Sequence, residues 1–410
     1  MIAVQVLGWF LLTAEVLIAI PILYVCILSF TAILITKKRR AVNTNPASSE
    51  ESTRYNFAIL VPAHNEELLL GNLLKSLTEL AYPKDKYAVY VVADNCTDTT
   101  AELARLIDGI RVYERYDADR RGKGYALGWL LQQLKEDQLV HDAYVILDAD
   151  SMVEPTFLQW MAKELARGAQ ALQAHYTVLN TTESPSTALR WIALTLKDYV
   201  WPLSRSSLGS SSTLTGNGMC FTHALLERCP WQAHGLSEDY QYYLTLVQHG
   251  ERVRFVPEAV VRSHMPTTFT AMRTQDIRWE LIGNGQTVWQ ITLGLLKAGL
   301  RLHKLMCFEA VMELLTPSLS YLVSWCLLML IASAVLRSLP ALLLSLTLSG
   351  GVIFYISTAF YLVRPPRMVY KAFLYAPGFM LWKLWVLLVL RRRKKHTNEW
   401  VRTNRTLSTK

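Results

Sequence analysis

The chain has 410 residues, which leaves room for one domain of roughly 200 residues together with membrane segments. Its net charge of +9 comes from basic clusters beside apolar segments, which attract anionic lipid headgroups, and no basic stripe with interleaved aromatic residues supports nucleic-acid binding. The six cysteines show no metal-ligand spacing, so we expect free thiols.

Apolar residues gather at the two ends of the chain. The segment Val4–Ile35 contains one charged residue, Glu15, and is followed directly by a basic cluster at 37–40. It is longer than the apolar core of a signal peptide and has no evident cleavage site, which predicts a retained transmembrane helix. Two further spanning candidates are Met306–Leu336 and Leu339–Val363.

A fourth apolar segment, Phe373–Leu390, has basic clusters on both flanks. Because basic flanks stay on the cytoplasmic side, we expect this segment to lie in the interface or to re-enter, although a full fourth span stays open. The same rule places the N-terminus outside and the middle of the chain inside. We therefore expect an integral protein of the plasma (inner) membrane with a cytoplasmic catalytic domain.

Strand and helix patterns alternate after a polar linker at 41–55. Apolar runs predict strands over 57–61, 87–93, 111–116 and 143–147, and helical spacing predicts helices over 69–80, 97–107 and 123–135. This alternation predicts an α/β fold with a parallel sheet covered by helices on both faces. Further on, we expect helices over 154–167, 186–206 and 238–248, a strand over 251–261, and a surface-lying helical stretch over 269–300.

Polar residues follow three of the predicted strands: Asn65 and Glu66 the first, Asp94 the second, and Asp148 and Asp150 the fourth. In open α/β sheets, ligands bind at this edge. Two carboxylates one residue apart suit a hard divalent cation that takes its other ligands from water and substrate phosphates. The pattern predicts a nucleotide diphosphate held through a metal, and the alternative is two surface aspartates that end an ordinary strand.

Three other positions have both a functional and a structural interpretation. Lys123, between two glycines, opens a predicted helix where it could meet a diphosphate, or it is a solvated lysine. Glu238 and Asp239 begin another helix, where acidic residues also serve as complements of the helix dipole. The run Gly216–Gly218 enters a strand and is equally consistent with an ordinary turn.

Six motifs occur in the order found in membrane-embedded family 2 glycosyltransferases, which the chain resembles over about residues 56–290. This group includes cellulose, hyaluronan and poly-N-acetylglucosamine synthases and is related to lipid glucosyltransferases. The motifs are Val61-Pro62-Ala63-His64-Asn65-Glu66, Asp94, Lys123, Asp148-Ala149-Asp150, Ser237-Glu238-Asp239 and Gln275-Asp276-Ile277-Arg278-Trp279. The resemblance implies a Rossmann-like nucleotide-sugar transferase domain of the GT-A type.

The resemblance also implies roles for these residues. Asp239 would be the catalytic base of an inverting displacement, and Asp148 and Asp150 would bind Mg²⁺ or Mn²⁺. The nucleotide-sugar would be bound by Asn65, Glu66, Asp94, Lys123, Asp148, Gln275 and Arg278, with Asp94 accepting the uracil N–H. The acceptor would be bound by Trp279, Gly216, Asn217, Gly218 and Glu238. Arg278 and Trp279 have an alternative as an interfacial tryptophan with a snorkelling arginine.

The expected organisation is a transmembrane anchor over 1–40, a linker over 41–55, the GT-A domain over 56–265 and an interfacial region over 266–303. Two transmembrane helices over 304–363 and an interfacial or re-entrant helix with a basic tail over 364–410 complete it. The expected function is β-glycosyl transfer from a UDP-sugar to a growing polysaccharide at the inner face of the membrane. The alternatives are transfer of one sugar to a membrane lipid and an inactive scaffold subunit.

Overall fold

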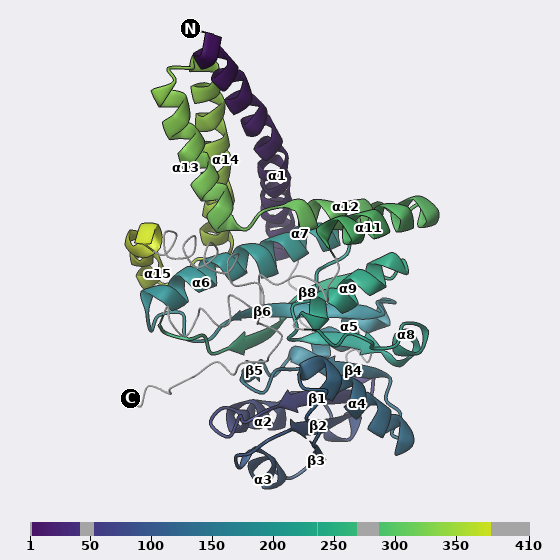
Figure 1. Ribbon diagram of the computed structural model, residues 1–410. Coiled ribbons are helices and arrows are strands. Elements are labelled where there is room, and N and C mark those ends of the chain that lie inside the picture. Colours follow the sequence, from purple (N-terminus) through teal and green to yellow (C-terminus); the bar gives the residue numbers. More distant parts are fainter. Residues whose placement is uncertain (1, 42–52, 236, 269–286, 379–410) are drawn as a thin grey trace.

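The computed structural model describes residues 2–41, 53–235, 237–268 and 287–378, and its centre is one mixed sheet (Figure 1). The strand order is β3-β2-β1-β4-β7-β6-β8-β5. The strands are β1 (Phe57–Ala63), β2 (Tyr87–Asp94), β3 (Ile110–Arg115), β4 (Ala143–Ile146), β5 (Ser151–Val153), β6 (Ala171–Val178), β7 (Met219–Thr222) and β8 (Val253–Ser263). Of these, β5 and β6 were not expected from the sequence, because β5 has only three residues and polar residues interrupt the apolar pattern of β6.

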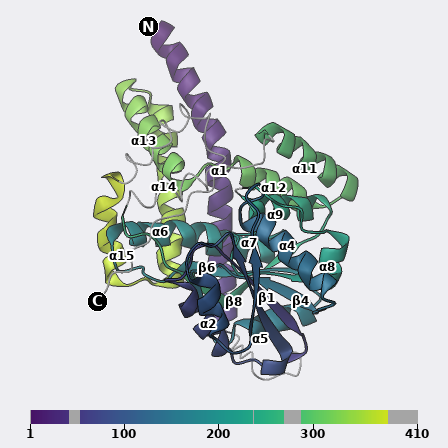
Figure 2. The same cartoon turned by 60° about the horizontal axis from the view of Figure 1, so that its bottom comes forward.

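Each face of the sheet is covered by helices, as the sequence predicts (Figure 2). In β1, Phe57 and Ile59 pack into one hydrophobic cluster and Ala58 and Leu60 into the other, because successive strand side chains point to opposite faces. One face carries α2 (Leu70–Thr78), α3 (Thr100–Arg105) and α5 (Phe157–Ala166). The other carries α4 (Lys123–Glu136), α8 (His223–Arg228) and α9 (Glu238–Gln248). The α/β fold is confirmed.

The four strands on which the expectation of a parallel sheet rests are parallel, and the later strands make the complete sheet mixed. Strands β3, β2, β1 and β4 are parallel, but β7 is antiparallel to both β4 and β6, and β5 is antiparallel to β8. The reason lies in the segment before β7, where the N–H of Gly218 donates to the Ile146 carbonyl at 2.9 Å. Because β7 begins beside the carboxyl end of β4, it has to run back along that strand.

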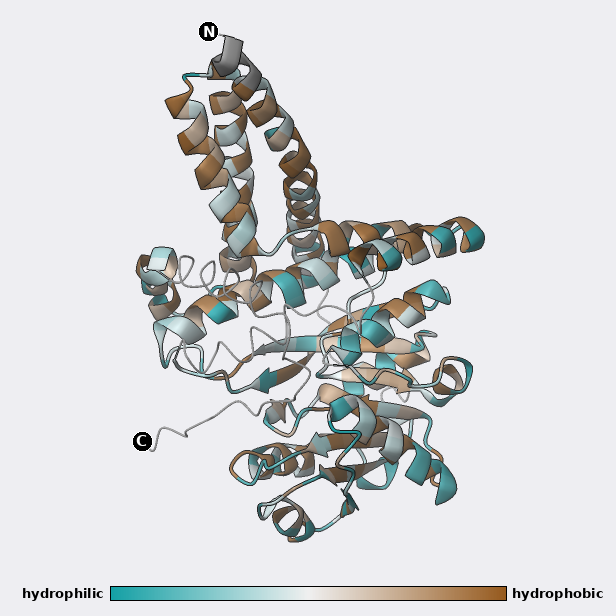
Figure 3. Cartoon of the chain, in the orientation of Figure 1, coloured by the Kyte–Doolittle hydropathy of each residue, from teal (hydrophilic) through white to brown (hydrophobic). Residues whose placement is uncertain are grey.

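Three helices rise from the sheet domain, and their surfaces are predominantly apolar (Figure 3). They are α1 (Ile2–Ala41), α13 (Leu319–Val335) and α14 (Leu339–Val363). Two described helices are long and apolar enough to cross a membrane, over Leu7–Arg39 and Leu339–Val363. The fold therefore has membrane-length helices near its N-terminus and in its C-terminal region.

The spanning candidate Met306–Leu336 is not one straight helix. The structure divides it into α12 (Leu305–Leu315) and α13, which meet at an angle of 62°. Pro317 lies in the break, where it cannot donate a backbone hydrogen bond to a continuing helix. Figure 1 shows α11 (Val288–Leu302) and α12 lying across the foot of the upright helices.

A second layer across that foot is formed by α6 (Pro185–Thr195), the π-helical turn Leu196–Val200 and α7 (Trp201–Ser207). The lower half of α1 packs on this layer, where Val25, Leu28 and Ala32 are fully or almost fully buried. The apolar stretch predicted as one membrane anchor thus also forms part of the contact with the sheet domain.

The remaining elements are short. They are the 3-10 turns Lys84–Lys86 and Phe373–Tyr375 and helix α15 (Arg367–Ala372). The predicted interfacial segment Phe373–Leu390 lies outside the described residues beyond 378, as does most of the predicted linker. All six cysteines are free thiols, as expected.

Candidate functional site

The carboxyl ends of the neighbouring parallel strands β1, β2 and β4 meet at one edge of the sheet. Leu60 of β1 pairs with both Tyr90 of β2 and Ile146 of β4, which brings the strand ends to a similar level. Asp94 is the last residue of β2, and Asp148 comes two residues after β4. The sequence prediction that these carboxylates share one edge is confirmed by the register.

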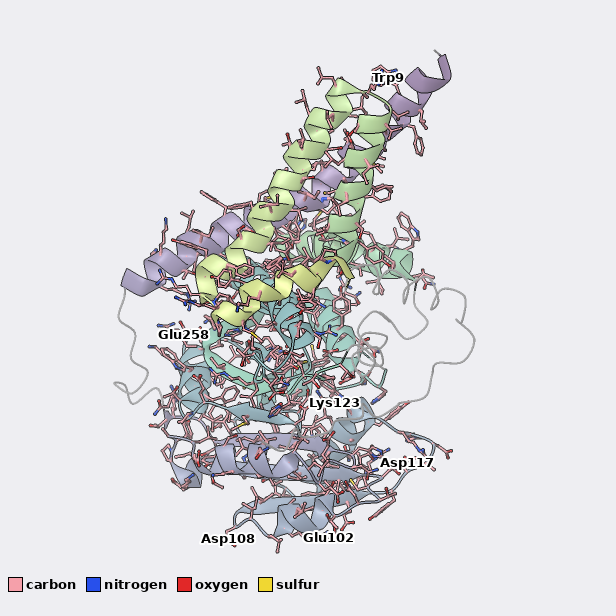
Figure 4. The ribbon with its side chains drawn as sticks, turned by 90° about the vertical axis from the view of Figure 1, so that its left-hand side faces the viewer. Trp9, Glu102, Asp108, Asp117, Lys123 and Glu258 are labelled. Atoms are coloured by element: carbon pink, nitrogen blue, oxygen red, sulfur yellow. The ribbon has the colours of Figure 1, made fainter. Side chains whose placement is uncertain are left out.

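Lys123 joins several parts of this edge (Figure 4). Its ammonium donates to Asp148 Oδ1 at 2.6 Å and to the Gly216 carbonyl, and it lies 3.8 Å from Glu238 Oε1. Burial alone would lower the pKa of Lys123, but Asp148, Glu238 and Asp239 together raise it above its usual value. The lysine is therefore a fixed positive charge between carboxylates.

Asp148 and Asp150 offer carboxylate oxygens as ligands for a metal ion. The Asp148 side chain is 35% exposed and already contacts Lys123. Within the described ranges, no group of three or more His, Cys, Asp or Glu side chains is placed to hold a metal ion. Two carboxylates still fit Mg²⁺ or Mn²⁺, because such ions complete their shell with waters and phosphate oxygens. The donor set suits a cation that arrives with a diphosphate.

Asn217 does not have the exposure that acceptor binding would need. It is fully buried, its side-chain oxygen accepts the Asp148 N–H at 3.2 Å, and its amide nitrogen donates to Ser151 at 2.7 Å and Ser263 at 3.2 Å. We correct its predicted role: this side chain positions the backbone of Asp148. The two serines were not recognised from the sequence, because only the folded sheet brings them to Asn217.

The flanking glycines are required by the backbone and by close contacts. Gly216 and Gly218 have φ values of +81° and +71°, in the region that favours glycine. A Cβ at Gly216 would lie 3.0 Å from Asp239 Oδ2, and a Cβ at Gly218 would lie 2.6 Å from the Ala174 Cβ. Gly216 thus leaves space beside Asp239, whereas Gly218 serves the packing of the sheet.

Glu238 and Asp239 form the first turn of α9. Glu238 is 8% exposed, and burial raises its pKa to about 7 despite the opposing effect of Lys123. Burial also raises the pKa of Asp239, and its Oδ1 accepts the Tyr240 N–H at 2.8 Å. The two adjacent carboxylates therefore hold protons more tightly than ordinary surface acids, as a proton acceptor near neutral pH requires.

Asp94 is buried in an ion pair that the sequence analysis missed. Arg115 Nη1 donates to Asp94 Oδ1 at 2.6 Å, and both side chains are less than 10% exposed. The two residues end the neighbouring strands β2 and β3 and are paired in their register. The ion pair could have been predicted only if that register had been known. The contact fixes the orientation of the Asp94 carboxylate at the edge of the site.

Asn65 and Glu66 connect two loops at the same edge. The Asn65 side chain accepts the Thr97 N–H at 2.7 Å and donates to Thr97 Oγ1 at 3.1 Å, while the Glu66 N–H donates to Thr100 Oγ1 at 2.8 Å. Asn65 has a positive φ of 55°, which asparagine tolerates better than most residues. Its amide is engaged on both sides by Thr97 and so holds the two loops together, and its contact with the nucleotide-sugar stays a prediction.

The last predicted motif, with Gln275, Arg278 and Trp279, lies outside the described residues. Its predicted contacts with the diphosphate and the acceptor remain predictions.

Two glycine substitutions distinguish the stability lost through a strained backbone from the stability lost through crowding of Asp239. Gly209 and Gly216 both have positive φ, so alanine at either position should cost roughly 1–2 kcal/mol in the free energy of unfolding. An alanine at 216 also crowds Asp239, whereas a Cβ at 209 meets no atom within 4 Å. We expect Gly216→Ala to destabilise the protein more than Gly209→Ala in denaturant unfolding. Equal losses would contradict the close approach of Asp239.

Comparison with known proteins identifies the family and the fold. A family model described as "Glycosyltransferase like family 2" matches residues 54–281. A mannosyltransferase from Pyrobaculum calidifontis, solved with GDP-Man and Mn²⁺, superimposes with a TM-score of 0.52 at 19% identity, over 88% of this chain and 99% of that chain. This likeness shows that the two chains share a fold.

Curated sequences show the same relationship. A beta-monoglucosyldiacylglycerol synthase from Nostoc sp. is 30% identical over 230 residues, which is 54% of this chain and 47% of the relative. Glucomannan 4-beta-mannosyltransferase 1 from Cyamopsis tetragonoloba is 26% identical over 56% of this chain and 45% of the relative. The chain spans about half the length of the curated relatives that it matches. Because the family model covers more than half of the chain, the protein belongs to glycosyltransferase family 2.

Proposed function

We propose that the protein transfers one sugar from a UDP-sugar to a membrane lipid, with inversion at the anomeric carbon, at the cytoplasmic face of the membrane. The observation that carries the chemical part of the proposal is the convergence of Lys123, Asp148 and Asp239 at the carboxyl edge of the sheet. The reaction needs one group that binds a diphosphate and another that accepts a proton. The ammonium of Lys123 can do the first, and a carboxylate can do the second.

Donor binding is assigned to the strand ends and the start of α4. Lys123 would exchange its contact with Asp148 for the donor diphosphate, helped by the N-terminus of α4. The Asp94 carboxylate, oriented by Arg115, would accept the imide N–H of uracil. Glu66, Gln275 and Arg278 are proposed as further contacts to the nucleotide-sugar.

Asp148 and Asp150 are proposed to hold Mg²⁺ or Mn²⁺ together with the diphosphate oxygens. When bound, the cation would neutralise the negative charge that grows on the leaving diphosphate. Asn217 supports this role from behind, because its side chain fixes the backbone N–H of Asp148.

Asp239 is proposed as the base that removes the acceptor proton. Its Oδ1 is held by the Tyr240 N–H, and its Oδ2 faces the space left by Gly216. One base suffices for a single displacement, and inversion follows from that mechanism. Glu238 is the neighbouring acid that would lie beside the acceptor.

Replacing Asp239 tests this assignment. Asp239→Asn should bind UDP-sugar and Mn²⁺ about as well as the wild type, while kcat falls roughly 10²–10⁴-fold because the base is lost. Donor binding by calorimetry and transfer of radiolabelled sugar measure the two effects. The exposed Asp108→Asn, far from Lys123 in Figure 4, is the matched control and should leave both unchanged. An equal loss of donor affinity and turnover would move Asp239 to the nucleotide site and make Glu238 the next candidate.

A cavity beside the membrane-length helix α1 favours a lipid acceptor. It has a volume of about 440 Å³ and lies between α1 and the break from α12 to α13. Its lining is mainly apolar and includes Ala14, Leu17, Pro21, Leu315, Pro317 and Trp325. A hydrocarbon chain matches this lining, and the relative that is 30% identical is named for a diacylglycerol glycolipid.

Extension of a polysaccharide is the second candidate. It is favoured by the Gln275-Asp276-Ile277-Arg278-Trp279 motif and by the glucomannan mannosyltransferase relatives. Trp279, which is predicted to bind the acceptor, would then contact the terminal sugar of the growing polysaccharide.

Filling the cavity distinguishes the two acceptors. Ala14→Trp should raise the KM for a long-chain lipid acceptor about tenfold or more while leaving a short-chain analogue unaffected, since part of the buried apolar contact is lost. Val16→Trp, at a position 57% exposed and outside the lining, is the control and should change neither. Extraction and sizing of the product should give a lipid with one sugar. A polymer made at the same rate by Ala14→Trp would contradict the lipid proposal.

A further inference from the structure

A fully buried arginine lies where the membrane-length helices meet the sheet domain. Arg205 of α7 has no exposed surface, and it forms ion pairs with two acids of α12, Glu309 at 2.6 Å and Glu313 at 2.7 Å. Their side chains are 20% and 7% exposed. One buried and one half-buried carboxylate around a fully buried guanidinium are costly to assemble, which suggests a role beyond local packing.

The same cluster contacts α9, the helix that begins with Glu238 and Asp239. Arg205 Nη2 donates to the Tyr243 hydroxyl at 2.7 Å, and that hydroxyl donates to Glu313 Oε2 at 3.1 Å. Tyr243 is on α9, four residues after Asp239, so the two residues lie on the same face one turn apart. The orientation of α9 is therefore fixed to α7 and α12 through this hydroxyl.

The cluster also holds the segment that leads to Gly216. Arg205 Nη1 donates to Thr213 Oγ1 at 2.6 Å, and the Ser210 hydroxyl donates to Glu309 Oε2 at 2.6 Å. Tyr24 of α1 donates to Glu309 as well, so the membrane-length helix is part of the same network. Three residues beyond Thr213, the Gly216 carbonyl accepts from Lys123.

We propose that Arg205 is a positioning residue that clamps α9 and the segment 210–216 to α12 and α1, and so sets the distance between Asp239 and the donor. The proposal rests on the proposed role of Asp239. It adds that the geometry of the base depends on contacts made at the foot of the membrane-length helices. Figure 1 shows α12 above α9, with one end beside the foot of α1 and a loop leading from that end to α13.

Two sets of variants test the clamp in the full-length protein reconstituted in lipid nanodiscs. Tyr243→Phe removes only the hydroxyl that connects Arg205 to α9. The triple variant Arg205→Met/Glu309→Gln/Glu313→Gln removes all three charges of the cluster, so it leaves no buried unpaired charge there. The matched control is Arg254→Met/Glu164→Gln, which removes a 3.0 Å ion pair between β8 and α5.

The clamp predicts a split between kcat and KM. Both cluster variants should lower kcat, normalised to the number of sites that bind Mn²⁺ and UDP, by roughly 10- to 100-fold, because small displacements of a reacting group have effects of that size. The KM for the donor should stay within about twofold, since Lys123 and Asp148 are not changed. The control variant Arg254→Met/Glu164→Gln should have the wild-type kcat and the wild-type KM for the donor.

Amide hydrogen exchange tests the clamp independently of turnover. Exchange should become faster in α9 and in 208–216 in the cluster variants, but not in α5 or β8. Unchanged exchange would overturn the clamp whatever the activity, and faster exchange with unchanged normalised kcat would overturn its positioning role. A wild-type rate in Asp239→Asn would refute the proposed base without altering the exchange result, so the two failures are distinguishable.

Discussion

The contact between Lys123 and Asp148 is the interaction on which the site depends. One ammonium faces the end of β4, the segment before β7 and the start of α9, because it also contacts the Gly216 carbonyl and approaches Glu238. Without this charge, the carboxylates of Asp148, Glu238 and Asp239 would face one another in a partly buried place, which is unfavourable. The charge that organises the site is the same charge that we assign to the donor diphosphate.

Helix α9 is held at two points with different chemistry. Its first turn, with Glu238 and Asp239, lies at the sheet edge beside Lys123, and its middle is bonded through Tyr243 to Arg205 and the acids of α12. The antiparallel β7 makes the first contact possible, since the segment before it returns to the carboxyl end of β4. The fold thus places the proposed base between the sheet and the membrane-length helices.

The features that depend on local patterns could be predicted from the sequence. An apolar run ending in two aspartates predicts a buried strand with Asp148 at its end, and the structure has that strand. Features that depend on distant partners could not be predicted: Asn217 has turn-like neighbours but fixes Asp148, and Arg205 meets acids about a hundred residues away. The break at Pro317 was missed because apolar composition continues through it.

The most direct test of the central claim is the affinity for Mn²⁺ with and without UDP, measured by electron paramagnetic resonance titration. Because Asp148 is already paired with Lys123 and only two carboxylates are proposed as ligands, Mn²⁺ should bind weakly alone and at least tenfold more tightly with UDP, once diphosphate oxygens complete its shell. Asp150→Asn should abolish the gain. Equal Mn²⁺ affinity with and without UDP would contradict a site assembled jointly by Lys123, the two aspartates and the diphosphate.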